Sequence, residues 1–184
     1  MTTVREARII RRSDRRTTPW ANGAGTTAEI AAGVASRWRF SVATLEAGST
    51  FFSPFPGVDR IFTVIGDHPV SLDFGGGPTL IPRLSPTAFA GERGPDCVAE
   101  GPTEAFNVMV HRTTTAASVN IVDIGAAHDV DADGRLAALA LVLGGRLTTD
   151  LGLVEPGDCL LVERGSVRVS GPASVVIAEI LDRT

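Results

Sequence analysis

A charged pair and a polar strand residue are the side chains best placed to hold a small molecule. Asp59-Arg60 follows the Pro56-Gly57 turn, and Asn107 lies between Phe106 and Val108. Arginine suits carboxylates because its planar guanidinium donates bidentate hydrogen bonds. Neighbouring side chains on a strand point to opposite faces, so Asp59 and Arg60 cannot both face one pocket. The sequence leaves open which of them does, and whether the pair is instead a structural ion pair at the turn.

Further candidate pocket residues follow from the same alternation. Asn107, Met109 and His111 share one strand face, so an amide beside a thioether could line a pocket. The alternative for Asn107 is a core amide that bonds to the backbone. Trp20 and Asn22 flank a single residue and would also share a face. Trp20 would supply an apolar wall with one N–H donor, unless it serves only core packing.

The sequence gives little support for a metal site or for a catalytic nucleophile. His68, His111 and His128 show no metal-ligand spacing, so we expect no metal and no cofactor, with an oxygen-rich magnesium or calcium site as the alternative. Cys97 and Cys159 form no Cys-x-x-Cys motif and are expected to be small reduced core residues. We therefore assign no catalytic residue. The competing hypothesis is a metal-independent isomerase or hydrolase in which Asp59 or another pocket acid acts as general base.

The composition of the chain limits the classes of partner that we expect. The chain has 184 residues and a net charge of −4, so no general attraction to nucleic acid is expected. Six of its 17 basic residues, all of them arginines, fall between Arg5 and Arg16, where acidic residues interrupt them; we interpret this segment as a solvated strand face and turn. No apolar run is long enough for a membrane helix or a secretory signal. These features predict a cytoplasmic protein whose partners are neither nucleic acid nor membrane.

Strand-like segments recur along the whole chain, separated by glycine and proline turns. The segment 136–143 is ambiguous because alanine and leucine favour helices, but the Gly144-Gly145 turn that follows favours a strand. Strands are also predicted at residues 37–43, 60–65, 70–74, 104–112, 118–124, 160–163, 166–169 and 174–180. This density of strands predicts an all-β fold.

A weak internal repeat divides the chain into two halves. Each half contains a strand, a glycine turn, a second strand, a proline turn and a third strand, with the glycine turns at Gly66-Asp67 and Gly144-Gly145. We expect residues 1–184 to form one unit built of two antiparallel β-barrels packed together. The first barrel would span residues 1–124 with the N-terminal strands, and the second, smaller one residues 125–184. Two copies of the chain would pair into a dimer.

Four motifs resemble one known family when they are taken in order. They are Pro19-Trp20-Ala21-Asn22-Gly23-Ala24-Gly25-Thr26-Thr27, Trp38-Arg39-Phe40-Ser41-Val42-Ala43, Phe52-Ser53-Pro54-Phe55-Pro56-Gly57-Val58-Asp59-Arg60, and Phe106-Asn107-Val108-Met109-Val110-His111-Arg112. Together with Phe89-Ala90-Gly91-Glu92 they resemble the HutD/Ves family over roughly residues 9–112. The family usually has a basic residue after the tryptophan and a further glycine in the turn, where this chain has Ala21 and Ala24.

The resemblance implies a bicupin fold of the RmlC-like jelly-roll type, in agreement with the two-half reading. It implies no established enzymatic activity. One branch of the family is linked to histidine utilisation, with formylglutamate or urocanate as candidate ligands, and another to stress. We therefore expect a protein that binds a small, anionic metabolite and has a regulatory role, the alternatives being the enzyme above or a partner-binding module. The candidate ligand-binding residues are Trp20, Asn22, Ser41, Asp59, Arg60, Asn107 and Met109.

Overall fold

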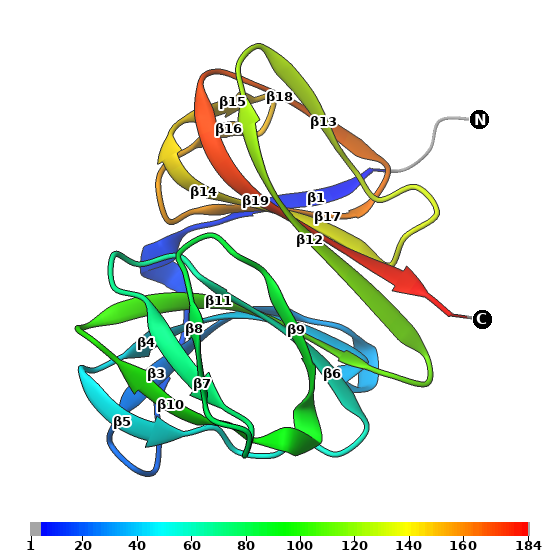
Figure 1. Cartoon of the computed structure of the whole chain (residues 1–184). Coiled ribbons are helices and arrows are strands. Elements are labelled where there is room, and N and C mark those ends of the chain that lie inside the picture. The colour runs from blue at the N-terminus through cyan, green and yellow to red at the C-terminus, as the bar shows by residue number, and fades with distance from the viewer. Residues whose placement is uncertain (1–4, 184) are drawn as a thin grey trace. The chain divides into compact units, whose positions relative to one another are not determined.

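The computed structural model describes residues 5–183, which divide into two compact units. The central unit is the continuous segment Arg16–Thr115. The terminal unit combines the described residues up to Arg15 with those from Ala116 onward. Both units consist of antiparallel sheets joined by turns and single 3-10 turns (Figure 1). The all-β prediction is therefore confirmed.

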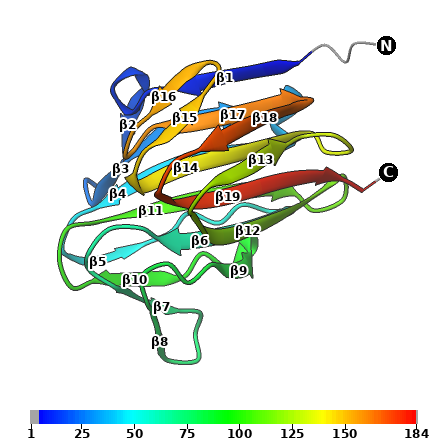
Figure 2. The ribbon, with the colours of Figure 1, turned by 90° about the horizontal axis from the view of Figure 1, so that it is seen from above.

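The central unit contains two sheets. Its strands in chain order are β2 (Thr17–Pro19), β3 (Gly25–Ala32), β4 (Trp38–Leu45), β5 (Gly48–Phe51), β6 (Val58–Val64), β7 (Val70–Asp73), β8 (Pro78–Ile81), β9 (Thr87–Ala90), β10 (Asp96–Ala99) and β11 (Thr103–His111). The larger sheet has the order β2-β3-β4-β11-β6-β9, and the smaller has the order β5-β10-β7-β8. Figure 2 shows the β7–β8 hairpin extending beyond the other strands of its sheet.

An apolar cluster joins the two sheets of the central unit. Leu45 and Phe62 from the larger sheet pack with Leu72 and Cys97 from the smaller sheet, and all four are fully buried. Alternation produces this arrangement, because every second residue of β6 and β7 points into the space between the sheets. At one end of the same sheet face, polar side chains replace the apolar ones, and this is where the pocket described below lies.

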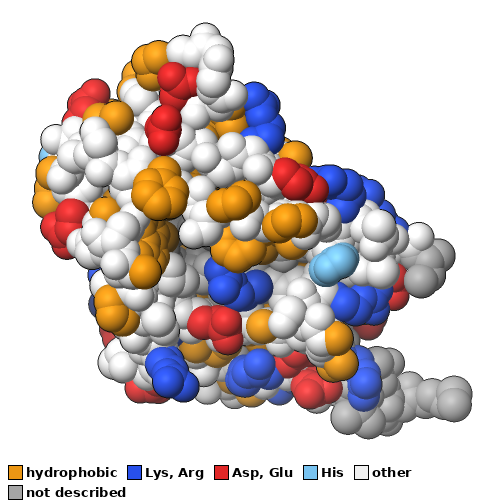
Figure 3. Space-filling view, turned by 90° about the horizontal axis from the view of Figure 1, so that it is seen from below, with side chains coloured by type: hydrophobic (Ala, Val, Ile, Leu, Met, Phe, Trp, Pro, Cys, Tyr) orange, Lys and Arg blue, Asp and Glu red, His pale blue; other side chains and the backbone are white. Residues whose placement is uncertain are grey.

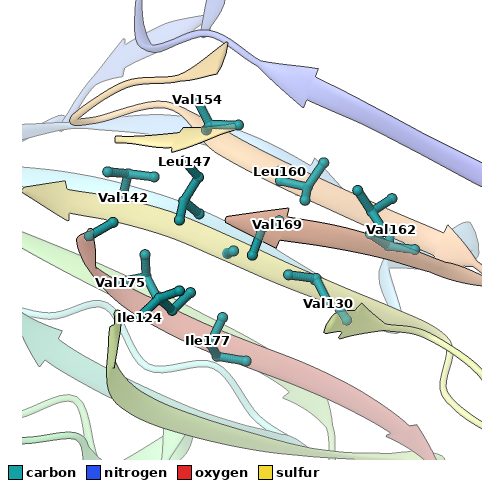
Figure 4. Packing of buried hydrophobic residues seen from close by; sticks show 14 of the residues in the cluster. Ile124, Val130, Val142, Leu147, Val154, Leu160, Val162, Val169, Val175 and Ile177 are labelled. Carbon is teal, nitrogen blue, oxygen red and sulfur yellow. The ribbon is translucent and has the colours of Figure 1, made fainter. Parts of the chain in front are cut away.

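The terminal unit also contains two sheets, ordered β1-β17-β14-β19-β12 and β13-β18-β15-β16. Its strands are β1 (Glu6–Ile10), β12 (Thr115–Ile124), β13 (Ala127–Asp131), β14 (Ala137–Gly145), β15 (Leu147–Thr149), β16 (Gly152–Val154), β17 (Cys159–Arg164), β18 (Ser166–Ser170) and β19 (Ala173–Asp182). Strand β14 confirms the strand prediction for the ambiguous segment 136–143. Figure 4 shows the core of this unit, in which Val142, Leu147 and Leu160 pack with Val169 and Val175.

Arginines near the N-terminus form ion pairs and hydrogen bonds within the terminal unit. Strand β1 pairs with β17, which places Arg8 beside Glu163 as an ion pair. Arg5, just before β1, forms an ion pair with Asp150 in the turn between β15 and β16. Arg11 donates to the Asp158 carboxylate at 2.7 Å, and the Arg12 backbone N–H donates to the same carboxylate at 2.9 Å. These contacts agree with the expectation of a solvated strand face and turn.

The units are assembled differently from the predicted halves. Strands β1 and β12 both lie N-terminal to residue 125, yet both belong to a sheet of the terminal unit. The reason is non-local strand pairing, since β1 finds its partner about 150 residues later in the chain. Over residues 5–183, none of the sheets returns to its own first strand, so no closed barrel is found. Within the same residues, no helix is long and apolar enough to cross a membrane.

Candidate functional site

A pocket of about 420 Å³ opens in the central unit. Strands β3, β4, β6 and β11 of the larger sheet form its floor, and the segment from Phe51 to Phe55 supplies an aromatic wall. Its polar and charged lining includes Thr27, Glu29, Arg39, Ser41, Asn22, Arg60 and Asn107. A cavity of this size, apolar in part and with a few convergent polar groups, suits a small-molecule ligand.

Strand register explains how these side chains meet. On one sheet face, Met109 of β11 lies opposite Arg39 of β4 on one side and Arg60 of β6 on the other. In the next row, Asn107 lies between Ser41 and Phe62. Rows of cross-strand neighbours point to the same face, so two arginines, an amide and a hydroxyl converge on one cavity.

Arg60 is the most deeply buried charged group of the pocket, with 8% of its surface exposed. Its Nε donates to Asn107 Oδ1 at 2.8 Å, and its guanidinium carbon lies 4.3 Å from the centre of the Phe52 ring. Within residues 5–183, no carboxylate pairs with it. Burial, and then the charge of Arg39, lowers its pKa from the ordinary arginine value to about 10. The group stays charged at neutral pH, and its two terminal nitrogens remain available to a ligand.

Arg39 is the second cation of the lining. One terminal nitrogen lies 3.3 Å from the Met109 sulfur, which is a weak acceptor. Its Nε is buried without a hydrogen-bond partner. Glu29 is the acidic residue that lines the pocket with it, but this side chain is exposed and forms no ion pair with either arginine. The pocket therefore carries two cations whose charges the described residues leave uncompensated.

The remaining candidates divide into pocket groups and supporting groups. Asn107 is 3% exposed; its Oδ1 accepts from Arg60 and its Nδ2 donates to the Ala105 carbonyl at 3.2 Å, so the amide is held in one orientation. Asn22 lines the pocket, but its side chain also bonds to Thr50 Oγ1 and to the Ala24 N–H, which stabilises the turn. Trp20 Nε1 donates to Thr27 Oγ1 at 2.8 Å, and the indole packs edge-on against Phe52.

Asp59 is the one predicted residue that does not line the pocket. Its carboxylate accepts from Arg112 Nε at 2.6 Å, and Arg112 also pairs with Glu92. The sequence left open which of these two neighbouring residues faces the pocket. Arg60 does, so Asp59 faces away from it. The structure thus brings together Trp20, Asn22, Ser41, Arg60, Asn107 and Met109, and places Asp59 in an ion-pair network.

Sequence reasoning missed Arg39 and the aromatic wall. Arg39 is two residues before Ser41 on β4, so the alternation that places Ser41 in the pocket also predicts Arg39 there. Phe51, Phe52 and Phe55 come from a segment whose position depends on packing between sheets, and no local periodicity predicts it. Phe51 is 58% exposed and Phe55 is 37% exposed, so apolar surface continues outside the pocket. The face seen in Figure 3 shows hydrophobic side chains gathered beside arginine and carboxylate side chains.

No cluster of three or more His, Cys, Asp and Glu side chains suited to a metal occurs in the described part of the chain. Cys97 and Cys159 are free and buried, as the sequence suggested. Burial raises the pKa of both thiols to about 12.

Comparison with known proteins gives the family. The model of the HutD family matches residues 12–177. The chain belongs to the HutD family. The resemblance seen in the sequence is thereby confirmed, and it extends through the terminal unit as well. Protein Ves from Cronobacter sakazakii is 37% identical over 111 residues, a stretch that is 56% of this chain and 60% of that protein. The chain therefore spans less than two thirds of that curated relative.

Solved structures are similar to this chain over a longer stretch than the curated relative is. A conserved protein of unknown function from Pseudomonas aeruginosa matches with a TM-score of 0.84 and 26% identity, covering 97% of this chain and 100% of that one. HutD from Pseudomonas fluorescens matches with a TM-score of 0.80, 26% identity and the same coverage. YhhW from Escherichia coli has a TM-score of 0.67 at 8% identity, covering 95% of this chain and 97% of that one, and it shows a shared cupin-like fold alone.

Proposed function

We propose that this HutD-family protein binds a small anionic metabolite, most simply a carboxylate, in the central-unit pocket. The observation that carries the proposal is Arg60, a buried guanidinium that faces a cavity without a carboxylate partner among the described residues. A buried charge is costly unless it is compensated, and a ligand carboxylate would compensate it through charge-assisted hydrogen bonds. Asn107 and Phe52 hold the guanidinium in place before the ligand arrives.

We further propose a regulatory role for this binding, in histidine utilisation or in a response to stress. The support is membership of the HutD family together with the likeness to HutD of Pseudomonas fluorescens. Formylglutamate and urocanate are the first ligands to test, since each carries a carboxylate. In the same proposal, each unit corresponds to one cupin-type half of a bicupin, which is supported by the two sheets and the apolar cluster found in each.

Binding is favoured over catalysis by the position of Asp59. The competing hypothesis used this carboxylate or another pocket acid as a general base. Asp59 pairs with Arg112 and lies outside the pocket lining, which leaves Glu29 as the acid that lines the pocket. Turnover of histidine-pathway intermediates by the purified protein would revive the enzyme hypothesis, with Glu29 as the acid to substitute first.

Calorimetric titration of a binding carboxylate against wild type and Arg60→Met tests the proposal. Loss of a charge-assisted contact is expected to cost about 1.5–3 kcal/mol, or about ten- to a hundred-fold in affinity. The ligand-free variant should be as stable as wild type or more so, because replacing a buried unpaired charge by an apolar side chain is favourable. Arg146→Gln, which removes an exposed cation outside the pocket lining, serves as the control and should bind normally. Unchanged affinity in a folded Arg60→Met protein would refute the proposal.

A further inference from the structure

We infer that Glu92, which lies outside the pocket lining, is a positioning residue that holds the aromatic wall against Arg60. This inference rests on the proposed function, because the wall borders the pocket in which the carboxylate would bind. The ring centre of Phe52 lies 4.3 Å from the guanidinium carbon of Arg60, so a shift of the wall changes what surrounds this charge. The motif Phe89-Ala90-Gly91-Glu92 supplies none of the described pocket-lining residues, and holding the wall gives it a role.

The backbone of the wall is bonded to a 3-10 turn, η3 (Gly91–Arg93), and to the residues that follow it. The Phe55 N–H donates to the Gly91 carbonyl at 2.8 Å, and the Phe52 N–H donates to the Pro95 carbonyl at 3.0 Å. These bonds fix the backbone of the wall at two of its aromatic residues. The position of the wall therefore follows the position of η3.

Glycine at position 91 allows η3 to lie directly against the wall. A Cβ there would lie 2.7 Å from the Phe55 carbonyl oxygen and 2.9 Å from the Val58 carbonyl oxygen. The two segments thus contact each other backbone to backbone at Gly91. A shift of η3 would be transmitted to the wall, because no side chain lies between them at this point to absorb it.

Glu92 connects η3 to the start of β6 and to the end of β11. Its Oε1 accepts from the Gly57 N–H at 2.8 Å. Arg112, which follows β11, donates one terminal nitrogen to each oxygen of the same carboxylate, at 3.0 and 2.8 Å, and its backbone N–H donates to the Gly57 carbonyl at 2.9 Å. Isolated exposed ion pairs contribute little to stability, but a bidentate arginine–carboxylate pair within a network is the arrangement in which they do contribute.

The Glu92 carboxylate is charged at neutral pH. The hydrogen bonds from Arg112, and then from the Gly57 N–H, lower its pKa to about 2. In Glu92→Ala, Arg112 keeps its bonds to Asp59 and to the Val58 carbonyl, so the start of β6 stays bonded to the end of β11. The substitution removes the side-chain connection between η3 and β6.

Acrylamide quenching of tryptophan fluorescence tests the position of the wall without a ligand. The Trp20 indole packs edge-on against the Phe52 ring, with 6.3 Å between ring centres, whereas Trp38 is 4% exposed and shielded from the quencher. Loosening of the wall in Glu92→Ala should uncover Trp20, so we expect a higher quenching constant and a red-shifted emission. Glu100→Ala, which removes an exposed glutamate at the other end of β10, should match wild type.

Calorimetric titration with urocanate tests the effect of the wall on binding. Glu92→Ala should weaken binding about five-fold or more from outside the pocket, because Phe52 then no longer holds the Arg60 guanidinium in place. In Phe52→Leu the same substitution should weaken binding about two-fold or less, since the two changes act on one contact. Glu100→Ala should bind urocanate as wild type does.

An unchanged quenching constant in Glu92→Ala would overturn the inference, whatever that variant does to binding. Urocanate binding that Glu92→Ala leaves unchanged, or weakens equally in Phe52→Leu, would also overturn it, because the wall would then not be the route by which Glu92 acts. If neither urocanate nor formylglutamate binds wild type, the proposed function fails, and the quenching result alone decides whether Glu92 holds the wall. Thermal unfolding verifies the fold of each variant, and Glu92→Gln, which keeps one acceptor oxygen, replaces Glu92→Ala if the alanine variant does not fold.

Discussion

Arg60 shows how a single side chain can be held ready for a ligand. Its lowered pKa means that the charged form is less favourable in the folded protein than in the unfolded chain. At this site the unfolded chain therefore binds more protons above about pH 10, and the contribution of Arg60 to the free energy of unfolding rises with pH only in that alkaline range. At neutral pH the folded protein carries the cost of the charge, and a bound carboxylate would relieve it.

Asn107 is a positioning residue for this charge. In Asn107→Asp, a carboxylate would take the place of the amide oxygen that accepts from Arg60 Nε. The new ion pair would neutralise Arg60, so we expect affinity for a carboxylate ligand to fall about ten-fold or more, measured by calorimetry. Asn107→Ala is the matched variant, since it removes the same bond without adding charge. If Asn107→Asp weakens binding no more than Asn107→Ala does, the charge of Arg60 is not what the ligand recognises.

At the scale of elements, the turn between β2 and β3 fixes one wall of the pocket. The backbone N–H of Trp20 donates to the Gly25 carbonyl at 2.9 Å, which closes the turn. A side chain at position 25 has no room: a Cβ there would lie 2.2 Å from the Thr44 carbonyl oxygen and 3.2 Å from the Trp20 ring. Glycine at this position lets β3 approach β4 closely while the indole covers it.

Gly25→Ala should therefore disturb both the strand pairing and the pocket. We expect a loss of about 1–3 kcal/mol in the free energy of unfolding from overpacking, measured by denaturant titration. Displacement of Trp20 should also shift its fluorescence and weaken ligand binding. Gly76→Ala is the control, since a Cβ at that loop position meets nothing within 4 Å. Equal stability of the two variants would show that β3 can move away from β4 without penalty.

The same elements show how far sequence reasoning reaches. Alternation along 37–43 and 104–112 predicts β4 and β11 and places Ser41, Asn107 and Met109 on pocket faces, because these signals are local. The alternation could not show which of Asp59 and Arg60 faces the pocket, because it establishes only that neighbouring side chains point to opposite faces of the sheet. The pairing of β1 with β17 and the aromatic wall at Phe51–Phe55 depend on contacts between distant segments, for which the sequence carries no local signal.

At the scale of the whole molecule, each unit carries one buried thiol. Cys97 lies in the core of the central unit, and Cys159 lies on β17 of the terminal unit. Because burial raises both pKa values to about 12, neither thiol should react with an aryl disulfide reagent in the native protein at pH 8. Reaction at Cys97 or Cys159 would then report the opening of the unit that contains it.

A carboxylate that binds the pocket should slow the reaction of Cys97 and leave Cys159 unchanged, because a ligand stabilises only the unit whose opening destroys its site. At a ligand concentration of about 100 times Kd, the protection should approach about a hundred-fold. Cys97→Ala and Cys159→Ala proteins allow each thiol to be followed alone. Equal protection of both thiols would mean that the two units open together.

The discontinuity of the terminal unit has a consequence for synthesis on the ribosome. The central unit is one continuous segment that ends at Thr115, so all of its strands have emerged before most of the terminal unit is translated. Strand β1 is made first but has to wait for β17, its partner at Cys159–Arg164. During that interval Arg8, with Arg5 and Arg11 just outside the strand, keeps the unpaired strand charged, which is a known safeguard against association with other chains. The pocket would thus be complete in the nascent chain while the N-terminal strand is still unpaired.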